Sequence, residues 1–374
     1  MSQTILLIGA GKIGRMIATM LRCSGDYQLR IADRVPAALT RIQKHAPSAE
    51  VHVLNADSHD QLVHLMQGCS AVISALSFRE NPGVARAALQ AGVNYFDLTE
   101  DRQTTAAVKE IADDAASGQV FVPQCGLAPG FVTIVSKHVM EWFDEIDTVH
   151  MRVGALPQHP TNALGYNLTW STDGLINEYC NPCEVIHGRK IRNQLPLEGL
   201  EQFTLDGNVY EAFNTSGGLG TLCETMHGQV RELNYKTIRY PGHHMFMKFL
   251  LHDLRLADRR ELLKDVMENA IPITFQDVVI VFCTVTGNRN SQFVEKSDMR
   301  KLYAQEINGE QWSAIQLTTA AGICAVVDLV QQNQLSGTGL IRQEDIPFEL
   351  FINNRFGSYF DTEKLLSEPS SFIK

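Results

Sequence analysis

The sequence has no excess of positive charge and no long apolar run. Its 32 lysine and arginine residues against 42 aspartate and glutamate residues give a formal net charge of −10. This balance argues against a broad basic surface for nucleic acid or anionic lipid. A membrane-spanning helix needs about 20 consecutive apolar residues, and the run at residues 278–283 has only the length of a strand. We therefore expect neither a nucleic-acid partner nor a membrane partner.

The N-terminus lacks the pattern of a targeting segment. Residues 1–4 carry no basic region, and the apolar stretch at residues 5–8 runs directly into glycines. The eight cysteines are mostly scattered among apolar neighbours, which is typical of reduced core cysteines rather than of a disulfide framework. These features predict a cytoplasmic protein.

Complete metal and hydrolase motifs are also missing. Cys180, Cys183 and His187 supply part of a zinc tetrad, but no second pair of ligands follows. The sequence contains no G-x-S-x-G, no P-loop and no H-E-x-x-H motif. We expect no metal site.

The first third of the chain alternates apolar strands with helical patterns. At 374 residues with 44% hydrophobic residues, the chain is long enough for two or three globular domains. Strands alternating with amphipathic helices predict right-handed crossovers and a parallel sheet. The expected fold is therefore α/β, a doubly wound Rossmann-type sheet, with buried strands at residues 5–8, 29–32, 51–54, 71–75, 95–96 and 120–122.

The pattern changes after residue 130. Stretches of period two and long loops rich in Gly, Pro, Asn and Thr predict an α+β domain with a mainly antiparallel sheet. The expected organisation is a dinucleotide-binding domain, a substrate and dimerisation domain, a segment that returns to the first domain and a polar surface tail, with boundaries at 1–128, 129–312, 313–352 and 353–374.

A glycine fingerprint follows the first expected strand. Residues 9–14 (GAGKIG) fit G-x-G-x-x-G and open a helix, whose N-terminus favours phosphate groups. Asp33 closes the second strand, where a carboxylate can accept hydrogen bonds from both ribose hydroxyls. Asp33 repels a 2′-phosphate and so favours NAD, while Arg34 leaves NADP open.

The predicted cofactor-binding residues come from three places along the first domain. Residues at the end of the fourth strand lie where the nicotinamide ribose sits in such sheets. One cysteine precedes the GLAPG motif and lies near the nicotinamide, although a buried inert thiol is the plainer interpretation. The complete predicted set is Gly9, Gly11, Lys12, Ile13, Gly14, Asp33, Arg34, Ser74, Ala75, Leu76 and Cys125.

Five motifs together resemble the saccharopine dehydrogenase family, with lysine 6-dehydrogenase as the nearest branch. The resemblance extends over roughly residues 3–350, and its last two motifs are the most specific. It implies a Rossmann domain, a second domain for substrate and dimerisation, and nicotinamide-dependent oxidation at a C–N bond of an amino acid. The motifs are residues 9–14 with Asp33, 93–101 (VNYFDLTED), 126–130 (GLAPG), 211–218 (EAFNTSGG) and 236–243 (KTIRYPGH).

Amine oxidation needs a group that takes a proton and a cation that holds the substrate carboxylate. Asp97 follows the fifth strand and could bind the substrate ammonium or accept its proton, or it could cap the following helix. Arg239, in the KTIRYPGH motif, is the candidate clamp for the α-carboxylate, with a structural ion pair as the alternative. His243 is a second catalytic candidate, or else a hydrogen-bonded loop histidine.

Further substrate-binding candidates are Glu100, Thr215, Ser216 and Tyr166. Glu100 shares the ambiguity of Asp97. Thr215 and Ser216 could present hydroxyls and backbone N–H groups to an anion, or simply form a glycine turn. Tyr166 follows the loop that resembles the family's substrate loop, and it could equally be core.

These observations predict an NAD(P)-dependent oxidoreductase acting on an amino-acid C–N bond. The most specific expectation is oxidative deamination of the L-lysine ε-amine to 2-aminoadipate 6-semialdehyde. Glutamate-forming saccharopine dehydrogenase and carboxynorspermidine dehydrogenase are the alternatives within the class. Saccharopine carries three carboxylates and should need more cations than Arg239, for which Arg152, Arg189 and Arg231 are scattered candidates. A protein that senses NAD(H) without turnover is the alternative of another class, and a homodimer is expected from the resemblance alone.

Overall fold

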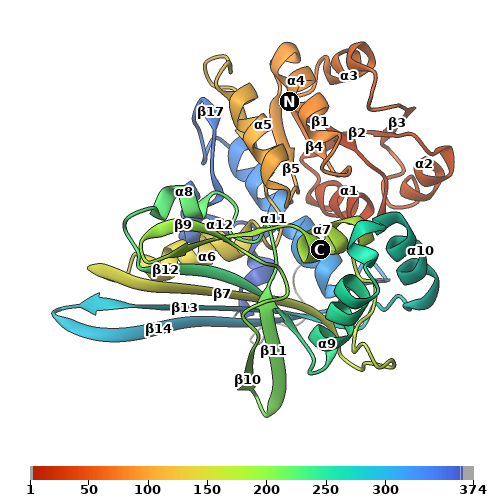
Figure 1. The fold of residues 1–374 in the computed structure, drawn as a ribbon. Coiled ribbons are helices and arrows are strands. Elements are labelled where there is room, and N and C mark those ends of the chain that lie inside the picture. The colour runs from red at the N-terminus through yellow and green to blue at the C-terminus, as the bar shows by residue number, and fades with distance from the viewer. Residues whose placement is uncertain (1–2, 363, 365–374) are drawn as a thin grey trace. The chain divides into compact units, whose positions relative to one another are not determined.

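A computed structural model describes residues 3–362 and 364 of the chain. The chain divides into two compact units, the first formed by Met1–Phe131 and Thr318–Lys374 and the second by Val132–Leu317. Two helices contain the crossings: α6 (Phe131–Met140) and α11 (Ala314–Gln331). Figure 1 labels most of the elements of both units.

The first unit is a three-layer α/β structure. Its elements are β1 (Gln3–Ile8), α1 (Lys12–Ser24), β2 (Tyr27–Asp33), α2 (Pro36–Ile42), β3 (Glu50–Val53), α3 (His59–Met66), β4 (Ala71–Ser74), α4 (Asn81–Ala91), β5 (Asn94–Asp97), α5 (Arg102–Ala112), β6 (Val120–Val122), β17 (Gly339–Leu340), η3 (Gln343–Asp345), α12 (Phe348–Asn353) and η4 (Gly357–Phe360).

The sheet of the first unit confirms the expected fold class. Over the described residues its strand order is β17-β6-β5-β4-β1-β2-β3, and every pair is parallel. All six strands expected from the sequence are present. The order reverses between β1 and β4, because β2 and β3 lie on one side of β1 while β4 lies on the other. Such a switch point is where open α/β sheets bind ligands.

Apolar residues cover the sheet because its strands are buried on both faces. On one face α3, α4 and α5 lie next to one another (Figure 1). Leu62 and Met66 of α3, Val84 and Ala88 of α4 and Val108 of α5 join the strands in one fully or almost fully buried cluster. The helical and strand periodicities in the sequence produce this core directly.

The second unit is built on a mixed sheet. Its elements are β7 (Glu145–Pro157), α7 (Thr172–Cys180), β8 (Cys183–His187), β9 (Lys190–Gln194), β10 (Glu201–Leu205), β11 (Asn208–Asn214), α8 (Leu222–Met226), β12 (Glu232–Arg239), α9 (His243–Lys248), η1 (Phe249–Asp253), η2 (Leu256–Asp258), α10 (Arg260–Ala270), β13 (Asp277–Arg289), β14 (Gln292–Tyr303), β15 (Gln305–Ile307) and β16 (Glu310–Trp312).

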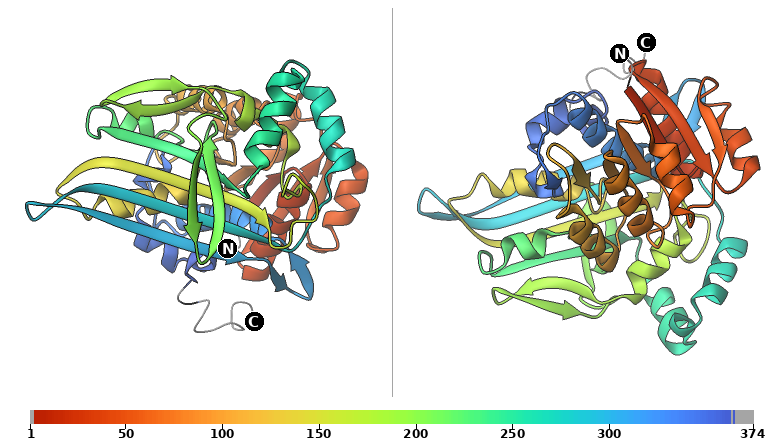
Figure 2. Two further views of the ribbon diagram at one scale, coloured as in Figure 1. Left: turned by 60° about the horizontal axis from the view of Figure 1, so that its bottom comes forward. Right: turned by 90° about the horizontal axis from the view of Figure 1, so that it is seen from above.

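The main path of this sheet runs β10-β11-β12-β7-β13-β14. Its strand pairs are antiparallel apart from β12 with β7. The long β13–β14 hairpin extends past the neighbouring strands, and the β10–β11 hairpin crosses one face of the sheet (Figure 2). Under that hairpin Tyr210 and Ala212 pack on Leu156, Ile238 and Ile280. The expected α+β domain with mainly antiparallel pairing is confirmed.

The returning segment completes the first unit. β17 adds to the sheet edge beside β6, and Phe360 stacks on Phe131 with 4.0 Å between ring centroids. Tyr27 of β2 donates to Asp328 of α11 at 2.5 Å, and Arg355 pairs with Asp328 at 2.6 Å. These contacts attach the end of the described chain to its beginning.

The expectation of a polar surface tail from Asn353 is wrong for Asn354 and for residues 356–360, which are buried, while Arg355 is exposed. Phe356, Tyr359 and Phe360 are buried. Phe360 packs on the rings of Phe131 and Phe351, with 4.0 and 5.6 Å between ring centroids, and such aromatic contacts favour burial. Residues 363 and 365–374 of the expected tail lie outside the described residues.

α11 is the one described helix that is long and apolar enough to cross a membrane, and 94% of it is buried inside the protein. Asp277 accepts hydrogen bonds from the N–H groups of Ala314 and Ile315 at 2.5 and 3.1 Å, so its carboxylate caps the start of this helix. Burial raises the pKa of Asp277 to about 6. An apolar sequence of this kind is typical of a core helix.

Candidate dinucleotide site and candidate amino-acid site

The glycine loop of the first unit has the geometry of a phosphate-binding turn. Gly9 has φ +106°, and a Cβ on it would lie 2.6 Å from the Ala75 carbonyl oxygen. A Cβ on Gly14 would lie 1.9 Å from the Gly9 carbonyl oxygen. A Cβ on Gly11 would meet no atom within 4 Å. The outer glycines are therefore required by packing, and Gly11 leaves open space at the N-terminus of α1.

Asp33 fixes this loop to the end of β2. Its Oδ2 accepts the Ala10 N–H at 2.7 Å and its Oδ1 accepts the Val35 N–H at 2.8 Å. The carboxylate therefore lies at the mouth of the loop, where its half-exposed oxygens can still accept from ribose hydroxyls. Arg34 beside it is exposed.

The residues after β4 lie against the same loop. Ala75 donates its N–H to the Ile8 carbonyl at 2.8 Å. A Cβ on Gly9 would also lie 3.4 Å from Cδ2 of Leu76. Ser74 is buried and donates to Asn81 Oδ1 at 2.7 Å. The structure thus brings residues 74–76 to the predicted cofactor residues around Gly9. Lys12 is exposed and Ile13 half-buried in the first turn of α1.

Asp97 and Cys125 are both buried within the first unit. The Asp97 carboxylate accepts from the Tyr95 hydroxyl at 2.7 Å and from the N–H groups of Thr99 and Gln124, each at 2.9 Å. Burial raises the pKa of Asp97. Cys125 donates to the Val122 carbonyl at 3.0 Å, and burial raises the pKa of its thiol. Glu100 follows at the half-buried end of the same turn.

These contacts give Asp97 a structural function, because it holds the turn at Gln124, a residue with φ +65°. The predicted capping role belongs instead to Asp101, whose Oδ1 accepts the Thr104 N–H at 2.8 Å. The predicted catalytic role of Asp97 stays a prediction.

The dinucleotide fits the residues present. Among the described side chains none caps the N-terminus of α1, Gly11 leaves room for the close approach of pyrophosphate, and Asp33 stands at the end of β2. Bound there, NAD(P) would supply the nicotinamide ring that accepts a hydride.

Arg239 is the central residue of a buried cluster in the second unit. It is the last residue of β12 and is 3% exposed. Its Nε donates to the Tyr179 hydroxyl at 2.9 Å and its Nη1 to the Ile238 carbonyl at 2.8 Å. The guanidinium lies over the Tyr166 ring, 5.0 Å from the centroid, and 5.9 Å from that of Tyr179. Tyr166 thus lies next to Arg239.

No described carboxylate forms an ion pair with Arg239. Two of the five N–H donors of a guanidinium are used by the contacts above. The Glu178 carboxylate is not in ion-pair contact with Arg239, but its charge contributes to raising the pKa of Arg239. A buried charge without an adjacent counter-ion is costly, so an anion at the remaining N–H groups would be favoured.

His243 continues this cluster on the far side of Tyr179. Its Nε2 lies 3.0 Å from the Tyr179 hydroxyl and its Nδ1 lies 2.9 Å from the Leu164 carbonyl. Burial, followed by the charge of Arg239, lowers the pKa of His243 to about 3. The ring is therefore neutral and has both nitrogens engaged at neutral pH. This arrangement does not favour the predicted acid–base role.

The loop before α7 contains buried polar atoms that lack partners. The Tyr166 hydroxyl faces Thr169 and Trp170 without a hydrogen bond of normal geometry, and Asn167 Oδ1 and Thr169 Oγ1 also have none among the described residues. All three residues are at most 6% exposed. Such atoms are rare in folded proteins and call for a partner from outside the chain.

Thr215 and Ser216 are engaged inside the second unit. The hydroxyls of Thr215 and Thr237 lie 2.7 Å apart, and Ser216 donates to the Asn177 carbonyl at 3.3 Å. Both residues are buried. Their contacts tie the TSGG turn to β12 and α7, which carry Arg239 and Tyr179. Their predicted binding roles stay predictions.

Two residues that sequence reasoning passed over organise this site. Glu211 accepts the N–H groups of Gly242 and His244 at 3.1 and 2.6 Å, which joins the EAFNTSGG and KTIRYPGH motifs. Tyr179 bridges Arg239 and His243. A glutamate within a motif could have been singled out, whereas a tyrosine on the apolar face of a helix carries no signal beyond core packing.

The scattered arginines do not add cations to this cluster. Arg152 bonds to Glu201 and Asn234, and Arg231 pairs with Asp147 at 2.8 Å. Arg189 is exposed. Among the described residues, Arg152 and Arg239 are the only buried lysine or arginine side chains. The described residues also contain no group of three candidate metal ligands.

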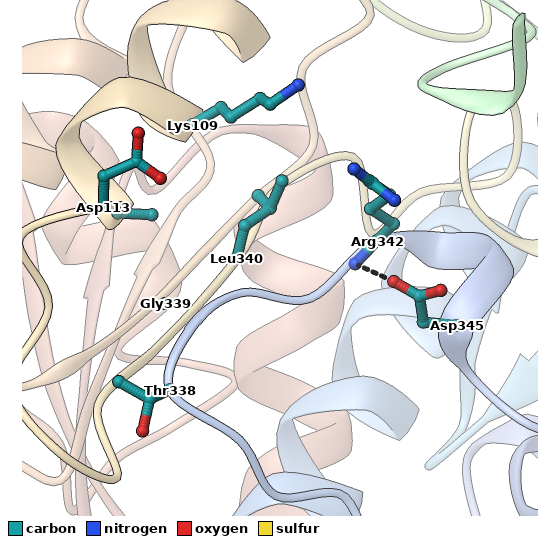
Figure 3. A pocket seen from close by; sticks show the side chains of 8 residues that line it. Lys109, Asp113, Thr338, Gly339, Leu340, Arg342 and Asp345 are labelled. Carbon is teal, nitrogen blue, oxygen red and sulfur yellow. Dashed lines mark hydrogen bonds between the residues drawn. The ribbon is translucent and has the colours of Figure 1, made fainter. Parts of the chain in front are cut away.

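A separate pocket of about 410 Å³ opens beside β17 in the first unit (Figure 3). Lys109, Asp113 and Arg342 line it, and the Arg342 N–H donates to Asp345 at 3.3 Å. None of the predicted site residues lines this pocket.

The parallel sheet, the glycine loop and a second domain with a buried cationic cluster define a dinucleotide-binding protein of the two-domain class. Residues 5–122 match the model of the saccharopine dehydrogenase NADP binding domain, and residues 126–356 match that of the saccharopine dehydrogenase C-terminal domain. The chain belongs to the saccharopine dehydrogenase family, which confirms the resemblance seen in its motifs. NAD(P) is accordingly the cofactor class of its first domain.

Individual relatives are distant. The chain is 24% identical over 309 residues to the mitochondrial alpha-aminoadipic semialdehyde synthase of Rattus norvegicus, covering 79% of this chain and 32% of that protein. It is 22% identical over 277 residues to the NADP(+), L-glutamate-forming saccharopine dehydrogenase of Saccharomyces cerevisiae, covering 69% and 59%. It thus spans between about a third and three fifths of these relatives.

The apo structure of saccharopine dehydrogenase (L-Glu forming) from Saccharomyces cerevisiae superposes with a TM-score of 0.77 at 14% identity, covering 98% of each chain. At this identity the match establishes the fold alone, and it supports the two-domain architecture.

Proposed function

We propose that this protein is an NAD(P)-dependent dehydrogenase that oxidises the ε-amine of L-lysine. One water is consumed, and the products are 2-aminoadipate 6-semialdehyde, ammonium and the reduced cofactor. In this reaction the ε-carbon loses a hydride to the nicotinamide, the nitrogen loses a proton, and water replaces the nitrogen of the resulting imine.

The observation that carries this proposal is the buried Arg239 without an adjacent carboxylate. A single α-carboxylate would use its remaining N–H groups and balance its charge. Tyr166 and Tyr179 would flank that carboxylate end of the substrate. In this scheme the glycine loop and Asp33 bind the cofactor, and Asp97 is the candidate that orients or deprotonates the amine.

The number of buried cations favours lysine over saccharopine. A substrate with three carboxylates would leave two of them without a buried lysine or arginine of the second domain, since Arg152 is already bonded to Glu201. Glutamate-forming saccharopine oxidation is the second candidate, and the names of the relatives favour it.

The test is the appearance of reduced nicotinamide with purified protein, NAD or NADP, and either L-lysine or L-saccharopine. We expect turnover of L-lysine that falls at least about 100-fold in kcat/KM in Arg239→Gln, because a desolvated charged contact is lost. Arg231→Gln is the matched control, since Arg231 pairs with acids on an exposed surface.

Three results would contradict this assignment. Turnover of L-saccharopine alone would replace the substrate and keep the family. An unchanged kcat/KM in Arg239→Gln would remove Arg239 from the substrate site. Tight cofactor binding without turnover of either compound would favour an NAD(H)-sensing protein.

A further inference from the structure

The hydrogen bonds around Arg239 have a single consistent direction. The Leu164 carbonyl can only accept, so Nδ1 of His243 carries the proton. The neutral ring then leaves Nε2 as an acceptor, and the Tyr179 hydroxyl must donate to it. The Tyr179 oxygen is thereby free to accept from Nε of Arg239. This assignment follows from the network of partners.

The hydrogen-bonded residues Arg239, Tyr179 and His243 are also buried away from solvent. Tyr179 and His243 are each 1% exposed and Arg239 is 3% exposed. The two aromatic rings meet edge to face with 5.9 Å between centroids, and Phe213 packs against both. Rotation of any member would leave a buried polar atom without a partner, which is unfavourable.

The alternative donor pattern is blocked by the charge of the neighbouring arginine. A protonated His243 would place a second positive charge beside Arg239 in a site away from water. Nε2 would then become a donor and compete with Arg239 for the Tyr179 oxygen. The chain therefore has one stable arrangement, with Arg239 held at Nε.

We propose that Tyr179 and His243 are positioning residues that fix the Arg239 guanidinium for the substrate carboxylate. The inference rests on the proposed role of Arg239. Holding Nε and one N–H of Nη1 leaves the remaining N–H groups in a fixed plane, which is the geometry a carboxylate needs for bidentate binding. His243 in this arrangement accepts a hydrogen bond and transfers no proton.

A double-mutant cycle between Tyr179→Phe and Arg239→Gln tests the proposal, with kcat/KM for L-lysine as the readout. Phe keeps the ring and removes the hydroxyl, so we expect a loss of about 10- to 100-fold in the native background. The loss should lie in KM, with kcat within about threefold of the native value. In the Arg239→Gln background the same change should cost less than about twofold, because the partner is absent.

Equal losses from Tyr179→Phe in both backgrounds would overturn the proposal, since they would indicate a general packing effect. An unchanged KM in Tyr179→Phe would overturn it as well. If Arg239→Gln alone has no effect, the proposed function fails instead, so the two failures are distinguishable. Thermal unfolding and cofactor affinity of each variant report whether the fold is retained.

The His243 variants separate positioning from proton transfer. Gln supplies an amide oxygen that can accept from Tyr179, whereas Phe supplies no acceptor. We expect His243→Gln to retain KM within about threefold and His243→Phe to raise it about tenfold or more, with kcat little changed in both. A collapse of kcat in both variants would overturn the positioning role in favour of acid–base catalysis.

Discussion

The two candidate sites are built in opposite ways. The dinucleotide site is formed by backbone: a glycine loop, a helix N-terminus and one aspartate, contained in residues 9–33 except for the contact with Ala75. The amino-acid site is formed by side chains: Tyr166 comes from a loop, and Tyr179, Arg239 and His243 come from three different elements. Backbone sites depend on local sequence, whereas side-chain sites depend on tertiary packing.

The largest effect is expected for Gly14→Ala, which tests whether close backbone packing requires a glycine in the dinucleotide loop. The added Cβ would lie 1.9 Å from the Gly9 carbonyl oxygen. Because this neighbour is a backbone atom, the clash cannot be relieved by rotating a side chain. We expect the free energy of unfolding to fall by about 3 kcal/mol or more, measured by urea unfolding. Gly11→Ala is the matched control, with unchanged stability and about tenfold weaker dinucleotide binding. Equal stability of both variants would contradict the packing argument.

The next largest effect is expected at Asp97, whose carboxylate holds two backbone N–H groups in the same domain. Asp97→Ala leaves the N–H groups of Thr99 and Gln124 and the Tyr95 hydroxyl without their acceptor. We expect the free energy of unfolding to fall by about 2–4 kcal/mol, measured by urea unfolding. The exposed Asp113→Ala should change it by less than about 0.5 kcal/mol. A similar small change in Asp97→Ala would show that water satisfies these groups.

The side-chain site should respond to acid. The folded-state pKa of His243, about 3, is below its ordinary value of 6.5 because of burial and then Arg239, with His244 adding to it. Below pH 6.5 the unfolded chain binds a proton that the folded site excludes, so stability is lost as the pH falls toward 3. Between pH 7 and 5 this costs about 2 kcal/mol.

Urea unfolding of the native protein and His243→Gln at pH 7 and 5 measures this loss. The variant should lose less stability on acidification than the native protein, by about that amount. Parallel losses in both proteins would assign the acid sensitivity to other groups.

The smallest expected effect lies at the edge of the backbone site. Arg34 is exposed beside Asp33 and is free to meet a 2′-phosphate. Arg34→Ala should weaken NADP by about tenfold more than NAD, measured by titration of each cofactor. An equal effect on both cofactors would place Arg34 away from the ribose phosphate.

The fold and the first site could be predicted to a large extent because their signals are local. Alternating strands and helices gave the parallel sheet, and the spacing of residues 9–14 and Asp33 gave the loop that the structure contains. The burial of residues 356–360 could not be predicted, because Phe360 packs on Phe131, which lies far away in the sequence.

The second site was predicted in part. Arg239, His243 and Tyr166 could be singled out through their motifs, and the structure brings them together. Tyr179 could not, since its spacing on α7 fits a core position equally well. The hydrogen-bond direction between Tyr179 and His243 depends on the Leu164 carbonyl, and no pattern in the sequence links residues 164, 179 and 243.

The return of the chain to its first domain has a consequence for the order in which the protein is made. Residues 3–122 leave the ribosome before the second domain, but the sheet edge at β17, the Phe360 stack on Phe131 and the Arg355–Asp328 pair all wait for residues that follow the second domain. The second domain is a single continuous stretch and can close as soon as it emerges. Of these two domains, the one whose synthesis starts earlier is therefore completed later.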